Sequence, residues 1–230
     1  MNARKRKLFP LALDLAGRPV VVAGGGAVAE RKVRRLVDCG ARVVVVSPAA
    51  TPGIRDLARD GAIEWHARGA EEADLAGQAL AFLATNDAEL NGRLARAARM
   101  AKIPANVATD AGACDFVVPA TLSRGDVEVA VFTASGSAAL SKWIARSLGR
   151  VLDSEIAPFS ELFAQIRGEV GGTIAAQEER AAALNRVLES DVLDVLKRDG
   201  YDAALSRARI VVREGADAPL HDTKDGGEPQ

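Results

Sequence analysis

The 230 residues can hold one large domain or two modest ones, each with a real core. The 30 Lys+Arg nearly cancel the 31 Asp+Glu, so no global basic field indicates nucleic acid. The two cysteines, Cys39 and Cys114, lie too far apart for a zinc ribbon or disulfide framework and fit a reducing compartment. No apolar run is long enough to span a membrane. Pro10 and Asp14 interrupt the short apolar stretch that follows the basic N-terminal residues, which argues against a signal peptide. We therefore expect a cytoplasmic protein that binds neither nucleic acid nor membrane.

The first half of the chain alternates strand-like and helix-like segments. Continuous apolar runs, typical of strands buried on both faces, predict the first two strands. Amphipathic helical patterns follow, and one begins at Thr51 with Pro52 in its first position. This rhythm predicts a parallel sheet with right-handed crossovers. The predicted strands are 18–24, 41–47, 62–67, 79–86 and 103–109, and the helices are 27–40, 51–61 and 87–102.

The pattern changes after residue 115. Two alternating strands joined near Gly125 predict an antiparallel ribbon within 116–135, and nearly everything from about 138 to 209 is helical in pattern. The last residues are polar and rich in Gly and Pro, which predicts disorder. We expect four parts: an α/β domain (1–115), a ribbon segment (116–150), a helical domain (151–214) and a disordered tail (215–230).

The stretch VVVAGGGAVAERK, residues 20–32, carries the first functional motif. Gly24-x-Gly26-x-x-Ala29 follows a predicted strand and opens a predicted helix, which is the context of the dinucleotide fingerprint. Gly24 would allow a tight turn, and Gly26 would let the backbone approach a pyrophosphate at the helix N-terminus. Ala29 is small enough for the helix to lie close on the sheet. We predict a Rossmann-type α/β fold that binds a dinucleotide; the alternative is a structural turn without a ligand.

The end of the second strand leaves the choice of dinucleotide open. Roughly 20 residues after the glycines, NAD sites usually offer Asp or Glu to the ribose hydroxyls. Here the strand ends in Ser47-Pro48-Ala49. A serine can bind a ribose but excludes a 2′-phosphate less firmly than a carboxylate does. The residues alone therefore do not separate NAD from NADP.

Two further strand ends carry polar residues. Ligands of open α/β sheets collect at the carboxyl ends of strands. Thr85, Asn86 and Asp87 follow the fourth strand and could either cap the next helix or also line the cofactor. The segment from Asn106 through Thr109 to Asp110 follows the fifth, and its alternative is a plain loop of turn-forming residues.

Several motifs together resemble a known family. GGGAVAERK, ATND, NVATDAGACDFVVPA and VEVAVFTASGSAALSKWIAR are similar to the siroheme-synthase N-terminal module, the precorrin-2 dehydrogenase and sirohydrochlorin ferrochelatase family. The resemblance spans roughly residues 7–210 and is to the stand-alone form. It implies that NAD accepts a hydride from precorrin-2 to give sirohydrochlorin, and that some members then insert Fe²⁺. It also implies a homodimer in which the ribbon segment exchanges contacts and the helical part covers the tetrapyrrole substrate.

The resemblance assigns cofactor contacts residue by residue. Ala27 and Val28 would contact the pyrophosphate, Pro48 and Ala49 would flank the adenosine ribose, and the ATND segment would line the nicotinamide. The complete set expected to bind the cofactor is Gly24, Gly25, Gly26, Ala27, Val28, Ala29, Ser47, Pro48, Ala49, Thr85, Asn86, Asp87 and Asn106.

The chain departs from the family pattern at the expected catalytic carboxylate. Members often read Asn-Val-Val-Asp, whereas here Thr109 occupies the aspartate position and Asp110 follows. Ala138 also stands where proline is common. Asp110 and Thr109 are the catalytic candidates. Because metal insertion relies more on a placed carboxylate than hydride transfer does, we favour the dehydrogenase and leave the chelatase and any metal ligands open.

A polycarboxylate substrate should attract cationic side chains. Lys142 and Arg146, one helical turn apart, are the best candidates, followed by Arg124, with Ser137 in the loop before them. The alternative is a solvated helix face. Two other functions compete with the enzyme: an NAD(H)-sensing regulatory module, and a degenerate homologue without activity. The ribbon and helices after residue 115 favour the enzyme, because a sensor domain usually ends near the Rossmann boundary.

Overall fold

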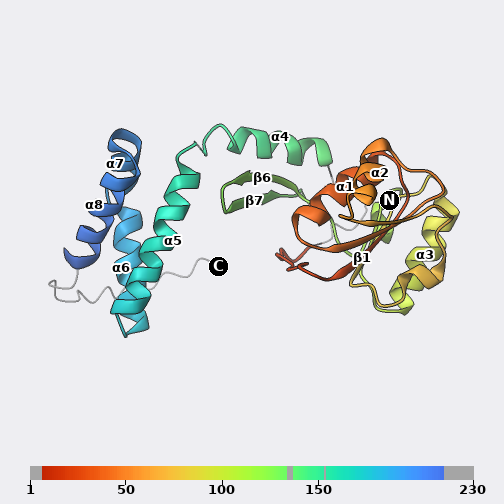
Figure 1. Ribbon diagram of the computed structural model, residues 1–230, viewed down its shortest axis with the longest axis horizontal. Helices are drawn as coiled ribbons and strands as arrows, with labels where there is room; N and C mark the ends of the chain where they lie inside the picture. The colour runs from red at the N-terminus through yellow and green to blue at the C-terminus, as the bar shows by residue number, and fades with distance from the viewer. Residues whose placement is uncertain (1–6, 134–136, 153, 215–230) are drawn as a thin grey trace. The chain divides into compact units, whose positions relative to one another are not determined.

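The computed structural model describes residues 7–133, 137–152 and 154–214. These form two compact units, one ending at Val118 and the other comprising 119–133 together with the residues from Ser137 onward (Figure 1). The expected tail, 215–230, lies outside the described residues. The predicted divisions at 115 and 150 stay predictions.

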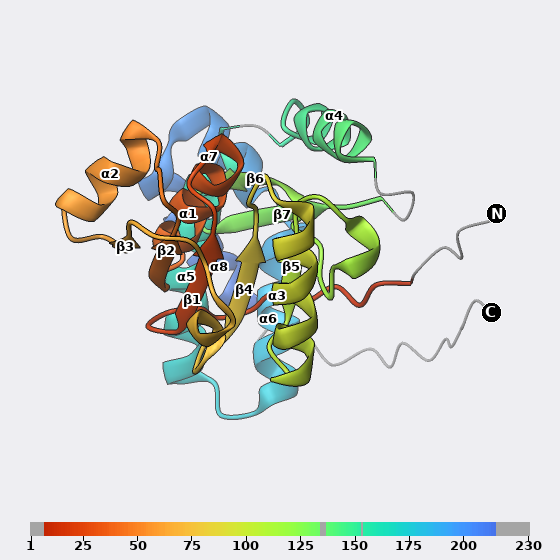
Figure 2. The same cartoon turned by 90° about the vertical axis from the view of Figure 1, so that its right-hand side faces the viewer.

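The first unit is built on a five-stranded parallel sheet, as predicted. Its strands run in the order β3-β2-β1-β4-β5, which Figure 2 shows from left to right. The order reverses between β1 and β4, so the carboxyl edge there is a topological switch point. The strands are β1 (Pro19–Ala23), β2 (Arg42–Val46), β3 (Glu64–His66), β4 (Leu80–Leu83) and β5 (Ala105–Val107).

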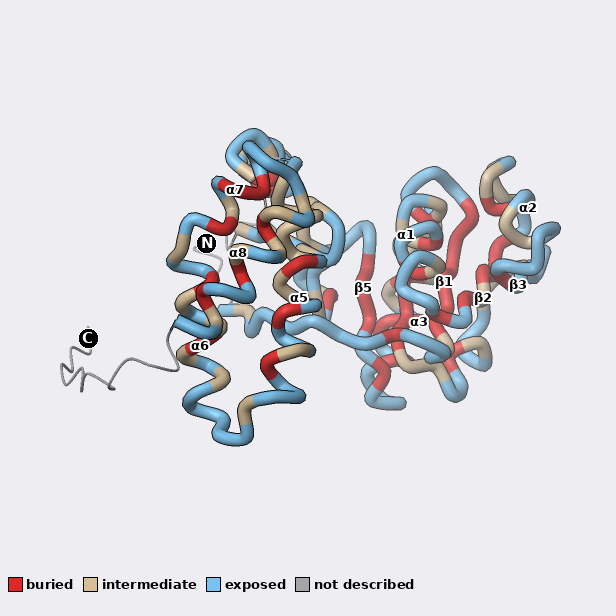
Figure 3. Tube along the Cα trace, turned by 60° about the vertical axis from the view of Figure 1, so that its left-hand side comes forward, coloured by how far each residue is buried: buried red, intermediate tan, exposed pale blue. Residues whose placement is uncertain are grey.

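Helices cover both faces of this sheet, which explains the unbroken apolar strands. Val20 and Val22 of β1 face the core shared with α1 (Ala27–Asp38) and α2 (Pro52–Arg59). Val21 faces the opposite core, shared with α3 (Ala88–Met100). Since successive side chains alternate between faces, a strand covered on both sides must be apolar throughout. Most of β1 and β5 is drawn as buried in Figure 3. Two 3₁₀ turns complete the unit, η1 (Glu72–Leu75) and η2 (Ala111–Ala113).

The helix boundaries follow the capping residues. The Thr51 hydroxyl accepts from the backbone N–H of Ile54 at 3.3 Å, and Pro52 is the first residue of α2, as predicted. The Asp87 carboxylate accepts from two N–H groups at the start of α3. Each cap satisfies donors that a helix cannot pair internally, so the sequence determines where these helices begin.

The three glycines after β1, Gly24 to Gly26, have different structural roles. Gly24 has φ +117°, and a Cβ on it would clash with the carbonyl of Ala84. A Cβ on Gly25 would clash with the carbonyl oxygen of Ala49. Only Gly26 faces open space. The missing side chains of Gly24 and Gly25 therefore make room for the protein's own backbone, and the positive φ of Gly24 suits the tight turn predicted there.

The second unit begins with the predicted antiparallel ribbon. Strands β6 (Ala120–Arg124) and β7 (Val127–Val131) pair in register around Gly125, which has φ +56°. Helix α4 (Ala138–Leu148) packs against both strands. The Arg124 guanidinium donates to the carbonyl oxygen of Gly149 at 3.2 Å and so ties the ribbon to the end of this helix.

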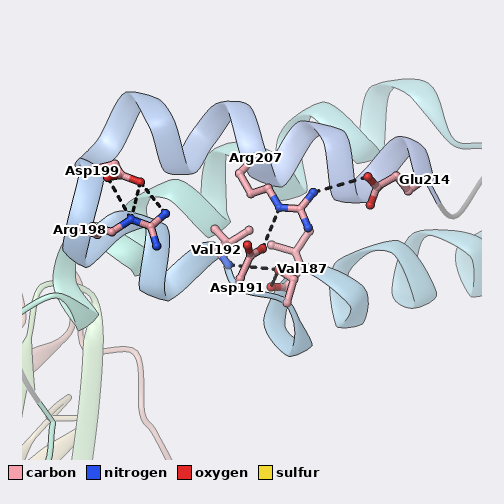
Figure 4. A network of polar contacts seen from close by, with 8 residues as sticks. Val187, Asp191, Val192, Arg198, Asp199, Arg207 and Glu214 are labelled. Carbon is pink, nitrogen blue, oxygen red and sulfur yellow. Dashed lines mark hydrogen bonds and ion pairs between the residues drawn. The ribbon is translucent and has the colours of Figure 1, made fainter.

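Four helices form the rest of the second unit: α5 (Ile156–Thr173), α6 (Gln177–Glu189), α7 (Val192–Asp199) and α8 (Tyr201–Glu214). Their shared core includes Leu162, Ile166 and Val187, which are at most 1% exposed. Figure 4 shows the polar contacts outside this core, in which Asp191 on the α6–α7 connection accepts from Arg207 Nε at 2.8 Å. Since exposed ion pairs contribute little, the apolar core holds these helices together.

No helix within the described part of the chain is both long and apolar enough to cross a membrane.

The glycine loop predicts a contrast between two adjacent substitutions. Gly25→Ala should lower the free energy of unfolding by about 2 kcal/mol or more, because the new methyl group overlaps the Ala49 carbonyl. Gly26→Ala should lower it by about 1 kcal/mol or less, because its site is open and its φ of −84° suits any residue. Urea unfolding of the two variants measures the difference. Equal losses would show that the close approach at Gly25 is not a stability determinant.

Candidate functional site

The N-terminus of α1 is exposed at the carboxyl edge of the sheet. Gly26 is its N-cap and, lacking a side chain, provides no capping hydrogen bond. Gly26, Ala27 and Val28 are exposed, whereas Ala29 is fully buried against the sheet, as its size predicted. The backbone N–H groups of a first helical turn have no intrahelical partners. Together with the helix dipole, they make this end of α1 a suitable site for an anionic group.

The turn after β2 borders this loop and is held rigidly. Ser47 Oγ donates to the carbonyl oxygen of Ala49 at 2.7 Å, and the indole of Trp65 donates to the carbonyl oxygen of Ser47 at 3.0 Å. The backbone N–H of Thr51 donates to the carbonyl oxygen of Gly25 at 2.9 Å. Pro48 and Ala49 are exposed beside the glycine loop. Ser47 is buried and its proton is already used, and a contact of this hydroxyl with a ribose stays a prediction.

The residues after β4 divide between capping and exposure. Asp87 caps α3 through Oδ1, which accepts from Glu89 and Leu90 at 2.9 and 3.0 Å. The Asp87 carboxylate therefore caps α3, which is one of the two roles that the sequence left open. Thr85 Oγ1 lies 2.8 Å from Asn91 Oδ1, and Asn86 is exposed. A contact of Thr85, Asn86 or Asp87 with a cofactor stays a prediction.

The sequence predicted no role for Asn91, which joins the ends of β4 and β5. Its side chain is fully buried on α3, and Nδ2 donates to the carbonyl oxygen of Thr85 at 3.0 Å. The same nitrogen lies 3.4 Å from Thr109 Oγ1, and Oδ1 accepts from the N–H of Thr85 at 3.3 Å. The sequence signal that could have identified Asn91 is a polar residue at a helix position that otherwise faces the core. Asn91 fixes Thr109 relative to the β4 end.

Asn106 on β5 is directed into the protein. It is 8% exposed; its Oδ1 accepts from Lys32 Nζ at 2.9 Å, and its Nδ2 donates to the carbonyl oxygen of Phe116 at 3.0 Å. Both ends of the amide are therefore occupied by protein groups. The predicted contact with a cofactor would have to compete with these bonds.

Lys32 was also missed, although it lies within the glycine motif. Its ammonium is 5.1 Å from the centroid of the Phe82 ring, and Phe82 packs edge-on against Phe116. Burial is the main cause that lowers the pKa of Lys32 below its ordinary value. The lysine thus supports the underside of the β4–β5 edge with a hydrogen bond and a cation–π contact.

The two catalytic candidates follow β5. Asp110 is exposed, and its Oδ1 accepts from the N–H of Gly112 at 2.7 Å, which caps η2 and orients the carboxylate. The buried Cys114 holds the segment from below: its Sγ accepts from the N–H of Val107 at 3.1 Å and lies 3.4 Å from the Asp110 carbonyl oxygen. Thr109 is exposed beside Asp110. The loop that follows β5 is therefore a braced turn rather than a free connection.

The substrate-binding candidates all lie in the second unit. Lys142 and Arg146 are exposed on α4, one turn apart. Ser137 caps this helix by accepting from the N–H of Leu140 at 3.2 Å, and Arg124 already donates to Gly149. Their contact with a substrate stays a prediction. No cluster of three or more His, Cys, Asp or Glu side chains suited to a metal ion occurs among the described residues.

Comparison with known proteins agrees with the class that the sheet and the glycine loop define. A family model described as "Putative NAD(P)-binding" matches residues 11–120. This covers the whole parallel sheet, including the open N-terminus of α1. The first unit is thus a Rossmann-type NAD(P)-binding domain.

Curated relatives and a solved structure narrow the class. The chain is 34% identical to siroheme synthase 1 of Aeromonas salmonicida over 80% of its own length and 40% of that protein's. It is 32% identical to the siroheme synthase of Thioalkalivibrio sulfidiphilus over 95% of its own length and 44% of that protein's. It shares its fold with SirC, precorrin-2 dehydrogenase, with a TM-score of 0.74 at 23% identity, over 88% of this chain and all of that one. The chain belongs to the siroheme synthase N-terminal module family, and it spans about two fifths of the length of these curated relatives.

Lys32 predicts a pH dependence of stability. Burial lowers its pKa in the folded state, so the unfolded chain binds this proton more tightly. The free energy of unfolding should therefore rise between the lowered pKa and the ordinary lysine value of about 10.4. Lys32→Met cannot titrate, so the stability of the wild type relative to this variant should increase with pH over the alkaline range.

Urea unfolding at several alkaline pH values measures this difference. Lys102→Met, at an exposed lysine, is the matched control and should run parallel to the wild type. Parallel curves for Lys32→Met as well would contradict the assignment of a destabilised charge to Lys32.

Proposed function

We propose that the chain catalyses the NAD-dependent oxidation of precorrin-2 to sirohydrochlorin in siroheme biosynthesis. The observation that carries the proposal is the uncapped, exposed N-terminus of α1 at the switch point of the sheet, in a chain of this family. The likeness to a solved protein titled precorrin-2 dehydrogenase supports the fold needed for this reaction.

The residues present fit a bound dinucleotide. Gly26 leaves open space where a side chain would otherwise stand, and the amides of the first turn of α1 would hold the pyrophosphate. The rigid turn at Ser47–Ala49 would flank the adenosine ribose, and Thr85 and Asn86 would border the nicotinamide. Bound NAD would supply the acceptor for the hydride that leaves the substrate.

The oxidation also releases one proton, which requires an acceptor. The Asp110 carboxylate is exposed after β5, and the Gly112 N–H holds one of its oxygens in place. Asp110 would accept the proton directly or through water, and Thr109 would help to position it. Fe²⁺ insertion stays outside the proposal, because Thr109 offers a hydroxyl where the family motif has a carboxylate.

A homodimer is also proposed, since large apolar side chains are exposed on α4 and on the residues that directly follow β7 and α4. A monomer would leave these side chains in water, whereas an interface would bury them. The exposed residues concerned are Phe132, Leu140, Trp143, Leu148 and Val151.

One assay tests the activity and its competitors. Precorrin-2 is generated anaerobically, protein and NAD are added, and the absorbance change to sirohydrochlorin is followed. An NAD(H) sensor or an inactive homologue would bind NAD and leave the spectrum unchanged, and that result would refute the proposed enzyme. Subsequent addition of Fe²⁺ to sirohydrochlorin decides the chelatase separately.

The roles of the two catalytic candidates predict unequal effects in this assay. Asp110→Asn removes the proton acceptor but keeps the Gly112 hydrogen bond, and it should lower kcat by about tenfold or more. Thr109→Ala removes only a hydroxyl and should lower kcat less. Equal or absent effects would refute the assignment of the carboxylate.

The pyrophosphate position predicts the effect of a charge at Gly26. Gly26→Asp places a carboxylate where the amides of α1 would meet the phosphates, and NAD binding should be lost. Calorimetric titration with NAD measures this loss. Gly26→Ala is the uncharged control, and it should bind NAD more tightly than Gly26→Asp does. Retained affinity in Gly26→Asp would show that the cofactor binds elsewhere.

A further inference from the structure

The structure brings a carboxylate to the β2–α2 turn from an unexpected element. The end of β2 is uncharged, Ser47 through Ala50. Glu30, however, stands in the first turn of α1, and its Oε1 lies so close to Gly53 in the first turn of α2 that a Cβ there would clash with it. Thr51 closes the β2–α2 turn as the N-cap of α2. A carboxylate of the neighbouring helix thus stands near the turn that follows β2, where NAD sites usually carry an acid.

Backbone contacts join the start of α1 to the turn beside the proposed ribose site. The N–H of Glu30 donates to the carbonyl oxygen of Gly26 at 2.9 Å, and the N–H of Thr51 donates to that of Gly25 at 2.9 Å. Ala49 also lies directly against Gly25. The glycine loop and the 47–51 turn thus form one surface, and Glu30 stands in the helical turn that begins at it.

Gly53 leaves space for the ion pair that Glu30 forms with Arg34. Arg34, one turn along α1, donates to Glu30 Oε1 from Nε at 3.0 Å and from Nη2 at 2.6 Å. A Cβ on Gly53 would clash with both Glu30 Oε1 and Arg34 Nη2. The absence of a side chain at position 53 of α2 therefore leaves space for this ion pair.

The Thr51 hydrogen bond, followed by that from Arg34, lowers the pKa of Glu30, so the carboxylate is ionised at neutral pH. The Glu30 side chain is 23% exposed. Because Arg34 binds Glu30 through Oε1, it offsets part of the Glu30 charge, and Nε and Nη2 of its guanidinium are in turn occupied.

Two charged groups near this turn are already paired. His66 ends β3, next to β2, and its Nε2 lies 3.7 Å from a Glu64 carboxylate oxygen. The Arg68 guanidinium is bound to Asp74 through two hydrogen bonds. Arg31 on α1 and Arg55 on α2 are exposed cations close to this turn in sequence, so the Glu30 charge would act on a 2′-phosphate against theirs.

We propose that Glu30 makes the dinucleotide site select NAD over NADP. Its carboxylate repels a 2′-phosphate and can accept from a 2′-hydroxyl, and it withholds the Arg34 guanidinium from any phosphate. The proposal rests on the proposed binding of a dinucleotide at the α1 N-terminus and adds its specificity.

Calorimetric titration of the full chain with NAD and with NADP tests this specificity. The wild type should bind NAD more tightly. Glu30→Gln removes the negative charge and frees Arg34, so NADP affinity should rise by about tenfold or more, while NAD affinity changes by about threefold or less. Glu89→Gln, at the exposed acid in the first turn of α3, is the matched control and should leave the ratio unchanged.

Two further variants separate repulsion from the release of Arg34. Glu30→Gln with Arg34→Gln should keep part of the gain in NADP affinity, because the repulsion is still removed. Arg34→Gln alone leaves the carboxylate unbalanced and should increase the preference for NAD. This variant retains Glu30, so it tests the proposal even where Glu30→Gln fails to fold.

The outcomes distinguish this inference from the proposed function. If the wild type binds NAD and NADP equally, or if the Glu30 and Arg34 variants leave their ratio unchanged, the specificity role is overturned while dinucleotide binding stands. If the wild type binds neither dinucleotide, the proposed function fails and this inference fails with it.

Discussion

The close approach of the glycine loop to two backbone carbonyls is the constraint on which the first unit depends. Gly24 lies against Ala84 and Gly25 against Ala49, so the ends of β4 and β2 meet the turn that follows β1. Any side chain at these two positions would push the strand ends apart. With the loop held in this way, α1 begins with Gly26 facing solvent, and its first turn stays open to an anionic ligand.

A second set of residues supports those that would touch a ligand. Trp65 holds the turn after β2, Asn91 joins the ends of β4 and β5, and Cys114 braces the segment that carries Asp110. Lys32 and Asn106 fill the space beneath them. A site that binds a dinucleotide and a large substrate in register gains from such preorganisation, because little must be ordered when the ligands arrive.

Charge is handled locally in a chain that is nearly neutral overall. Lys32 is half-buried, and this burial is the main cause that lowers its pKa. Glu30 is ionised and held by Thr51 and Arg34, which lowers its pKa as well. The first charge supports the sheet edge from inside the protein, and the second faces the site. Two charged residues of one short motif therefore act in different environments because they lie on different faces of α1.

The sequence by itself determined the elements and the nucleotide-binding loop. Apolar runs predicted the buried strands, Thr51 and Pro52 predicted the start of α2, and the glycine spacing predicted the open turn, because each of these signals is local in the chain. Only the tertiary structure decided which residues meet at the carboxyl edge. Lys32 and Asn106 are 74 positions apart, and Asn91 reaches Thr109 across 18. Such contacts exist because the sheet places β4 between β1 and β5, and no periodicity within a single segment records that order.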